Sequence, residues 1–365
     1  MRGQLDLSAL TPASRIVTNF AGANAPEAGE YISRFEDMGL LGEDAIKVDF
    51  ESGRTPEMTM QRYAIRGAAQ YAQVLSLPQG HLSADDIAAV PADVYSVAIG
   101  KADFDSIQRT LDSLQENGLP VYDALAEFED MTDVNLVEDV IGTLGGTFAI
   151  YNAESTGGGS LLSTVIMVTV NDRERLTKAI GRLADFANDV IDNEGDEAGK
   201  YIEFDPWLDH GTQLLSLRFP GVPVPIELTF AMTENWFIAA PTPQAALAAA
   251  RQADGHGDDG LASNPRLAPF IKEYGAGATS LSFIDSARTL RAGYPFLTLI
   301  ASALSNGVRS PGDVDARDPG MILPLYNDLK TSHIVPTVRI SAWDGDDLVT
   351  TMWSDSSLWV QAGSG

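Results

Sequence analysis

The sequence predicts an α+β fold in which quasi-repeated modules of antiparallel β-hairpins carry helices packed on one face. The first observation is a hairpin pattern: residues 146–153 and 161–170 are rich in β-branched and aromatic residues, and the Gly-rich residues 155–160 between them form a turn. The second is a capped amphipathic helix over residues 171–193. The third is recurrence, because residues 226–250 repeat the order of hairpin and helix.

The helix over 171–193 is the best-defined element of this pattern. The Asn-Asp pair at 171–172 supplies an N-cap, and Glu174 places an acid in the first turn. Its apolar residues recur at three- and four-residue steps: Leu176, Ile180, Leu183, Ala187 and Ile191. We expect Leu183 to be buried against the strand that carries Val165 and Met167.

The other elements follow in chain order. Two short helical patterns lie within residues 8–40, and a further helix is expected over 67–77. Strands are expected at 45–50, 57–65, 93–99, 200–204, 213–219 and 278–284, with a final hairpin at 337–343 and 348–353. Helical patterns cover 104–114, 122–128, 135–144 and 264–274, and another begins at Asp285.

This order divides the chain into three segments. Residues 1–84 form a partial N-terminal α+β module, residues 85–275 a central α+β module, and residues 276–365 a C-terminal strand–helix–hairpin module. Residues 93–117 and 278–303 both run from an alternating strand into an Asp-capped helix. We therefore expect these two stretches to adopt the same arrangement.

Composition excludes several classes of protein. The 365 residues carry 51 Asp and Glu against 24 Lys and Arg, a net charge of -27, which repels phosphate backbones, so no nucleic-acid partner is expected. The lack of Cys excludes disulfides, thiolate nucleophiles and zinc ribbons.

No transmembrane segment is expected, because no window approaches the roughly 18 consecutive apolar residues of a membrane span. A signal peptide is not evident either, and we expect a fragment excised from a longer protein.

The search for catalytic motifs assigns no catalytic residue, no metal ligand and no cofactor. The four His residues form neither an HExxH motif nor an i, i+4 pair. The acidic stretch 254–259 starts like a calcium loop but has Asp259 where glycine is needed and Pro265 where a Glu ligand is needed. Residues 344–347 are expected to form the turn of the final hairpin. A weak cation site at either acidic stretch remains an alternative.

The candidate binding residues are Asp205, Trp207, Asp209 and His210. In this cluster Asp209 would orient the His210 imidazole as a base, and Trp207 would stack on a sugar or an apolar ligand. The alternative is that Trp207 fills a gap in the core. A separate group of tryptophans is expected to form a hydrophobic lid over the last sheet: Trp343, Trp353 and Trp359.

Three pieces of the chain carry a family resemblance: residues 89–93 before a strand and an Asp-capped helix, residues 141–146 before a strand, and residues 235–243 before an Ala-rich helix. Across residues 85–290 the chain resembles a large bacterial family of exported or membrane-anchored proteins, which carry a domain of unknown function built from hairpin-plus-helix modules. The resemblance implies a periplasmic or cell-surface setting and an upstream anchor. It brings no catalytic residues, because the family has none assigned.

The sequence thus favours a non-enzymatic extracytoplasmic binding or scaffold protein, whose partner is an unknown protein or small molecule. One alternative is a hydrolase that uses carboxylates and His210. Another is a divalent-cation-dependent surface or adhesion protein. A cleft converging on Asp205, Asp209 and His210 would favour the hydrolase, whereas an exposed apolar patch would favour the binding protein.

The net charge of -27 generates the first testable prediction. Folding concentrates like charges that the unfolded chain spreads apart, so the melting temperature should rise with NaCl. Raising the salt from about 0.01 M to 0.15 M shortens the Debye length from roughly 30 Å to 8 Å. Thermal melts at matched ionic strength should show this rise, with no additional stabilisation by CaCl2. A flat response to NaCl would contradict the prediction.

Overall fold

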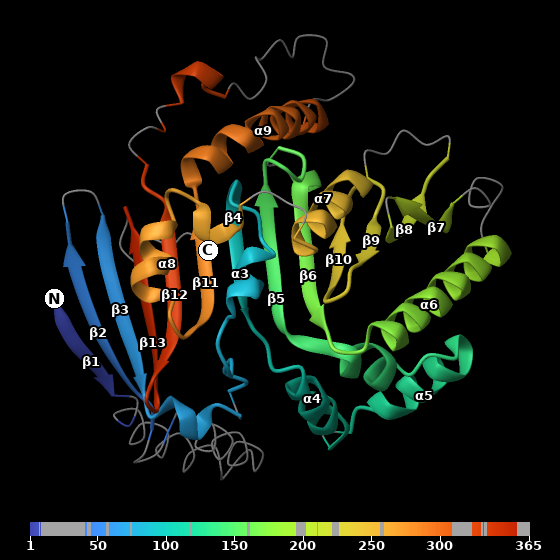
Figure 1. Cartoon of the computed structure of the whole chain (residues 1–365), viewed down its shortest axis with the longest axis horizontal. Coiled ribbons are helices and arrows are strands. Elements are labelled where there is room, and N and C mark those ends of the chain that lie inside the picture. Colours follow the sequence, from blue (N-terminus) through green and yellow to red (C-terminus); the bar gives the residue numbers. More distant parts are fainter. Residues whose placement is uncertain are drawn as a thin grey trace.

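In the computed structural model, one antiparallel sheet of thirteen strands organises the residues that are described (Figure 1). The described residues are 1–6, 8, 41, 45–55, 58–73, 75–116, 118–158, 161–194, 202–209, 211–220, 226–255, 259–308, 323–329, 331 and 334–355. The predicted α+β fold with antiparallel hairpins is confirmed. Among these residues, no helix combines the length and the apolar character needed to cross a bilayer.

The strands are short to medium in length, and most of them follow one another in groups of two to four between the helices. They are β1 (Arg2–Asp6), β2 (Lys47–Arg54), β3 (Thr59–Arg66), β4 (Val94–Lys101), β5 (Leu144–Ala153), β6 (Thr164–Val170), β7 (Glu203–Asp209), β8 (Thr212–Arg218), β9 (Thr229–Met232), β10 (Trp236–Ala240), β11 (Ala278–Ile284), β12 (Thr337–Asp344) and β13 (Asp347–Ser354). The α-helices are α3 (Ala84–Ala88), α4 (Asp105–Glu116), α5 (Val121–Thr132), α6 (Arg173–Glu194), α7 (Pro243–Ala253), α8 (Ala268–Tyr274) and α9 (Ser286–Val308).

The strand order is β1-β2-β3-β13-β12-β11-β4-β5-β6-β10-β9-β8-β7, with β11 and β4 side by side near the centre. The order in which the chain connects strands and helices is similar on the two sides of this pair. Strand β4 leads through helices to the hairpin β5–β6, and β11 leads through α9 to the hairpin β12–β13. Beyond these hairpins, β6 pairs with β10 and β13 pairs with β3. All three predicted segments therefore contribute strands to one sheet. Three-dimensional repetition of the modules stays a prediction.

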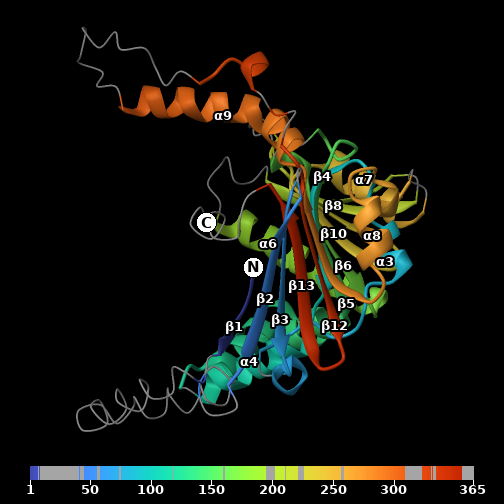
Figure 2. The same cartoon turned by 90° about the vertical axis from the view of Figure 1, so that its left-hand side faces the viewer.

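One face of the sheet carries the core. Helices α3, α7 and α8 lie on this face (Figure 2). A buried row of side chains crosses it from β8 to β5: Leu214, Ala231, Ile238, Met167 and Ala149. Helix α7 presents buried alanines to β9 and β10, and such small side chains allow close approach of helix and sheet. At the other end of this face, the Trp353 ring lies 5.0 Å from that of Phe270 and 4.6 Å from that of Tyr274 on α8.

The opposite face is covered only in part. Helices α4, α6 and α9 lie on this side (Figure 2), so helices flank both faces, in contrast to the prediction of one helical face. Ile150 and Ile166 remain 42% and 51% exposed here. Helix α6 packs on the edge strand β7, where Asn188 Nδ2 donates to the Phe204 carbonyl and Asn188 Oδ1 accepts from the Phe204 amide, at 3.0 and 2.7 Å.

The expected burial of Leu183 against Val165 and Met167 is wrong. Both of those side chains belong to the core on the α7 face, whereas α6 lies on the other side of the sheet. Leu183 is only half-buried, although Leu176 of the same apolar stripe is fully buried. The predicted period of the helix agrees with the structure, but the predicted packing partner does not, because periodicity does not specify which face of a sheet a helix will cover.

Other local differences are small. The expected helix at 67–77 is a single 3-10 turn (Ala68–Tyr71), and the expected helix at 135–144 is a short π-helix (Leu136–Val140) followed by a 3-10 turn. Strand β7 spans Glu203–Asp209, beyond the strand expected at 200–204. Most of residues 8–40 lie outside the described residues.

Neighbouring residues of β6 test which face holds the core. Met167→Ala should lower the free energy of unfolding by about 2–5 kcal/mol, because it removes a fully buried side chain. Ile166→Ala is the matched control on the other face. Because Ile166 is half-exposed, this change should cost about 1 kcal/mol or less. Urea unfolding measures both values, and equal costs would show that the two faces are packed alike.

Candidate apolar binding site

The predicted binding cluster is divided by the boundary of the described residues. Asp205, Trp207 and Asp209 are described and alternate along β7, so they share the face of the strand that looks toward α7. Asp205 forms an ion pair with Arg218, and the Asp209 Oδ2 atom lies 3.1 Å from Arg251 Nη2 on α7. His210 lies outside the described residues.

Trp207 also has a structural role. Its indole Nε1 donates a hydrogen bond of 2.9 Å to Ser216 Oγ, and its ring packs partly buried against the core. Ser216 in turn lies within hydrogen-bonding distance of Thr229, 2.9 Å between the hydroxyl oxygens. The described part of the predicted cluster thus forms ion pairs and a polar network that hold β7, β8 and β9 together. The main apolar cavity lies between α6 and the other face of the same strands, and Trp207 also belongs to its lining.

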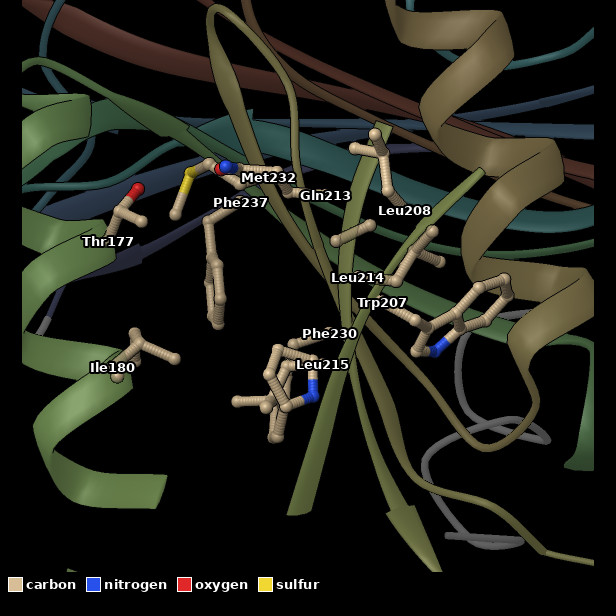
Figure 3. Close-up of a pocket in the computed structure, with 13 residues that line it drawn as sticks. Thr177, Ile180, Trp207, Leu208, Gln213, Leu214, Leu215, Phe230, Met232 and Phe237 are labelled. Carbon is tan, nitrogen blue, oxygen red and sulfur yellow. The ribbon is translucent and has the colours of Figure 1, made fainter. Parts of the chain in front are cut away.

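This cavity has a volume of about 600 Å³ and lies between α6 and strands β7–β10. Figure 3 shows Ile180 and Thr177 of α6 on one side and Phe237 extending into the space from the sheet. Phe230 and Leu215 line it from β9 and β8. Its volume falls within the range of roughly 300–1,000 Å³ that is typical of small-molecule sites.

The register of the strands explains why this face is apolar. One cross-strand row, here called the apolar strip, consists of Pro206, Leu215, Phe230, Ala239, Ile166 and Ile150. Every member is apolar, and each lies on the face opposite the buried row, because successive side chains alternate. The rings of Phe230 and Phe237 stack with centroids 5.7 Å apart and an interplanar angle of 11°. The strip leads from the cavity to the exposed surface of β6 and β5.

Gly181 lies in the middle of the 22-residue helix α6 and lines the cavity. A Cβ atom at this position would meet no other atom within 4 Å, so close packing does not require glycine here. Glycine in a helix interior costs about 1 kcal/mol relative to alanine. Gly181 is exposed, so a larger side chain would fit at this edge of the cavity without displacing other atoms.

A second, more polar hollow of about 590 Å³ lies near α3 and the end of α7. Its buried carboxylate, Asp86, accepts from the Ser83 amide at 2.8 Å in a capping box and from Lys101 Nζ at 2.8 Å. Lys101 also donates to Thr147 Oγ1 at 2.7 Å, and Gln252 donates to the Ala88 carbonyl at 2.9 Å. These groups are engaged within the protein, so they hold α3 against the sheet and are less suited to holding a ligand.

The remaining predicted features also have structural roles. Trp353 is buried beneath α8, and Trp343 Nε1 donates to the Pro78 carbonyl at 2.9 Å, whereas Trp359 lies outside the described residues. The predicted turn at 344–347 is confirmed, with Gly345 at a φ of 62°. Asp347 accepts from the Gly67 amide at 2.8 Å. Residues 256–258 of the other acidic stretch lie outside the described residues.

Of the predicted binding residues, Trp207 also lines the cavity, and sequence reasoning missed the other cavity residues. They come from one helix and four strands, and no short motif contains them. Two signals were present: apolar residues occupy both faces of residues 213–219 and 226–232, and Gly181 interrupts an otherwise strong helix. Apolar residues on both faces indicate that the outer face is covered by something, either by protein or by a ligand.

Asp86 gives a prediction on the dependence of stability on pH. Burial alone would raise the pKa of the Asp86 carboxyl, but hydrogen bonds from Lys101 and Ser83 outweigh burial and hold this pKa below its ordinary value. The folded state therefore binds this proton less tightly than the unfolded state. The resulting stabilisation is fully present above the unfolded pKa of about 3.9 and is lost as the pH falls through the folded pKa.

Asp86→Asn should lower the free energy of unfolding at pH 7 by about 3 kcal/mol, because Lys101 loses its buried partner. The difference from wild type should shrink as the pH falls toward 3. The exposed neighbour Asp85 provides the control, and Asp85→Asn should change stability by about 0.5 kcal/mol or less. Urea unfolding at several pH values measures both variants. A difference that does not vary with pH would contradict the assignment.

Comparisons with known proteins identify no match that could indicate what the cavity binds. No family model, no curated protein and no solved structure matches this chain. The resemblance to exported bacterial proteins over residues 85–290 therefore stays a prediction.

Proposed function

We propose that this chain is a non-enzymatic binding protein that holds an apolar ligand in the cavity between α6 and strands β7–β10. The observation that carries the proposal is an open, apolar cavity of about 600 Å³ between α6 and the sheet. Apolar side chains such as Phe230, Phe237 and Leu215 are only partly covered by the protein itself. A ligand would remove this surface from water and stabilise the folded state.

The lining supports binding in preference to chemistry. Thr177 and Gln213 are the polar side chains of the described lining, and neither is an acid or a base at neutral pH. General acid–base catalysis requires a titratable group within hydrogen-bonding reach of the reacting atoms. The carboxylates of the predicted cluster, Asp205 and Asp209, lie on the opposite face of β7 in ion pairs with arginines.

The setting of this function is a separate part of the proposal. A periplasmic or cell-surface location follows from the resemblance to exported bacterial proteins over residues 85–290, and the geometry of the cavity is compatible with any compartment. The ligand is a small molecule in this proposal, because the cavity is a concave space between a helix and a sheet and not a flat surface.

Filling the cavity from Gly181 tests the proposal. The uncharged fluorescent probe N-phenyl-1-naphthylamine should bind to the wild-type protein in a saturable manner. Gly181→Trp should weaken its binding about 10-fold or more, because the indole would occupy the space that the ligand needs. The variant should not lose stability, since tryptophan has a higher helix propensity than glycine by roughly 0.5 kcal/mol. Fluorescence titration and thermal melts measure the two quantities.

Gly293 on α9 provides the matched control. It too lies within a helix, and a Cβ atom there would meet nothing within 4 Å, but it does not line the cavity. Gly293→Trp should leave the affinity for the probe unchanged. Equal affinities for the wild type and Gly181→Trp would refute the cavity as the site of binding.

A further inference from the structure

We propose that the ligand of this cavity is an anionic amphiphile, a long aliphatic chain with a carboxylate or phosphate headgroup. The inference rests on the proposed function and adds the chemical class of the ligand. The headgroup is recognised by Arg173 and Lys178 at the N-terminal end of α6, and the chain occupies the cavity and the apolar strip.

The cavity opens directly onto a charged hollow. This neighbouring hollow of about 430 Å³ is lined by Arg173, Glu174, Lys178, Thr177 and Gln213. Thr177 and Gln213 also line the apolar cavity, so the two spaces are adjacent. A molecule with an apolar tail in the cavity would therefore place its polar end among these charged side chains.

The cations of α6 differ in whether they are paired with acids. Arg175 forms ion pairs with Glu138 and Asp139, and Arg182 pairs with Asp133. Arg173 and Lys178, by contrast, have no ion-pair or hydrogen-bond partner among the described residues.

Acids outnumber cations about two to one in this chain of net charge -27, yet neither of these side chains has an acidic partner among the described residues. Glu174 is the one acidic residue of the described lining, so the hollow carries two positive charges against one negative charge. An anionic headgroup would supply the missing partner, and each charge-assisted hydrogen bond it accepts is stronger than a bond between neutral groups.

The apolar strip indicates that the tail is a chain and not a compact ring. The strip crosses six neighbouring strands from β7 to β5, which corresponds to roughly 24 Å at the spacing of strands in a sheet. Ile166 and Ile150 continue the apolar surface beyond the part that α6 covers, and they remain about half-exposed. An extended aliphatic chain matches a narrow row of apolar side chains, because it can cover all of them at once.

The test compares three molecules that differ only in the headgroup: dodecanoate, dodecyl phosphate and dodecanol, each below its micelle concentration. Displacement of N-phenyl-1-naphthylamine from the full chain gives the affinities. The wild type should bind the two anions at least 10-fold more tightly than dodecanol, and 0.5 M NaCl should reduce this preference. Inorganic phosphate alone, without a tail, should not displace the probe.

The double variant Arg173→Gln/Lys178→Gln should weaken the binding of both anions about 10-fold and leave the affinity for dodecanol unchanged. The matched control is Arg175→Gln/Arg182→Gln, which removes two cations from the same helix that are already paired with acids. This control should leave all three affinities unchanged.

The outcomes separate this inference from the proposed function. If the wild type binds dodecanol as tightly as dodecanoate, or if the Arg173/Lys178 variant keeps its preference for anions, the headgroup site is refuted while apolar binding stands. If inorganic phosphate binds as tightly as dodecyl phosphate, the site binds anions without an amphiphile, and the inference fails. If neither the probe nor any of the three chains binds, the proposed function itself fails.

Discussion

The backbone ladder between β4 and β11 is the interaction on which the rest of the structure depends. It joins the two halves of the sheet, with β1–β3 and β11–β13 on one side and β4–β10 on the other, and five residue pairs from Ser280–Gly100 to Ile284–Ser96 form it. Gly100 permits close approach at this seam, since a Cβ atom there would lie 3.1 Å from the Ser280 Cβ and 3.4 Å from the Phe148 ring. Without this ladder, each half would expose a long strand edge in the middle of the core.

The two faces of the continuous sheet differ in how completely they are covered by helices. On one face, the alanines of α7 and the rings of Trp353 and Phe270 close the core, and the side chains of the buried row are excluded from solvent. On the other face, α6 packs on the edge strand β7 and spans the neighbouring strands without filling the space above them. The cavity is therefore a consequence of where α6 is anchored, and Asn188, which bonds both backbone groups of Phe204, is part of that anchor.

Ion pairs connect many of the elements of the sheet and its helices. Many of the arginines that hold elements together are paired with acids, as Arg288 is with Glu154 while its guanidinium lies 4.4 Å from the centroid of the Tyr95 ring. Such exposed pairs contribute little to stability individually, and they fix orientation more than they add free energy. Arg173 and Lys178, which have no ion-pair partner among the described residues, lie beside the apolar cavity.

The sequence by itself determined the local elements of this protein. Alternation in 146–153 and 161–170 predicted β5 and β6, capping at 171–172 predicted the start of α6, and the Asp-Gly turn at 344–347 predicted the final hairpin, because each of these signals acts between residues close in the chain. The α+β class followed from their order. Only the tertiary structure decided that β3 pairs with β13 and β10 with β6. These strands are far apart in the sequence, and their pairing depends on which apolar side chains are buried together in the folded sheet. The tertiary structure also decided the site. Asp205 and Asp209 form ion pairs with arginines from other elements. The cavity is lined by residues of one helix and several strands, among them Phe230, Phe237, Ile180 and Gly181. These residues become neighbours only when the sheet has formed and α6 has docked on its edge.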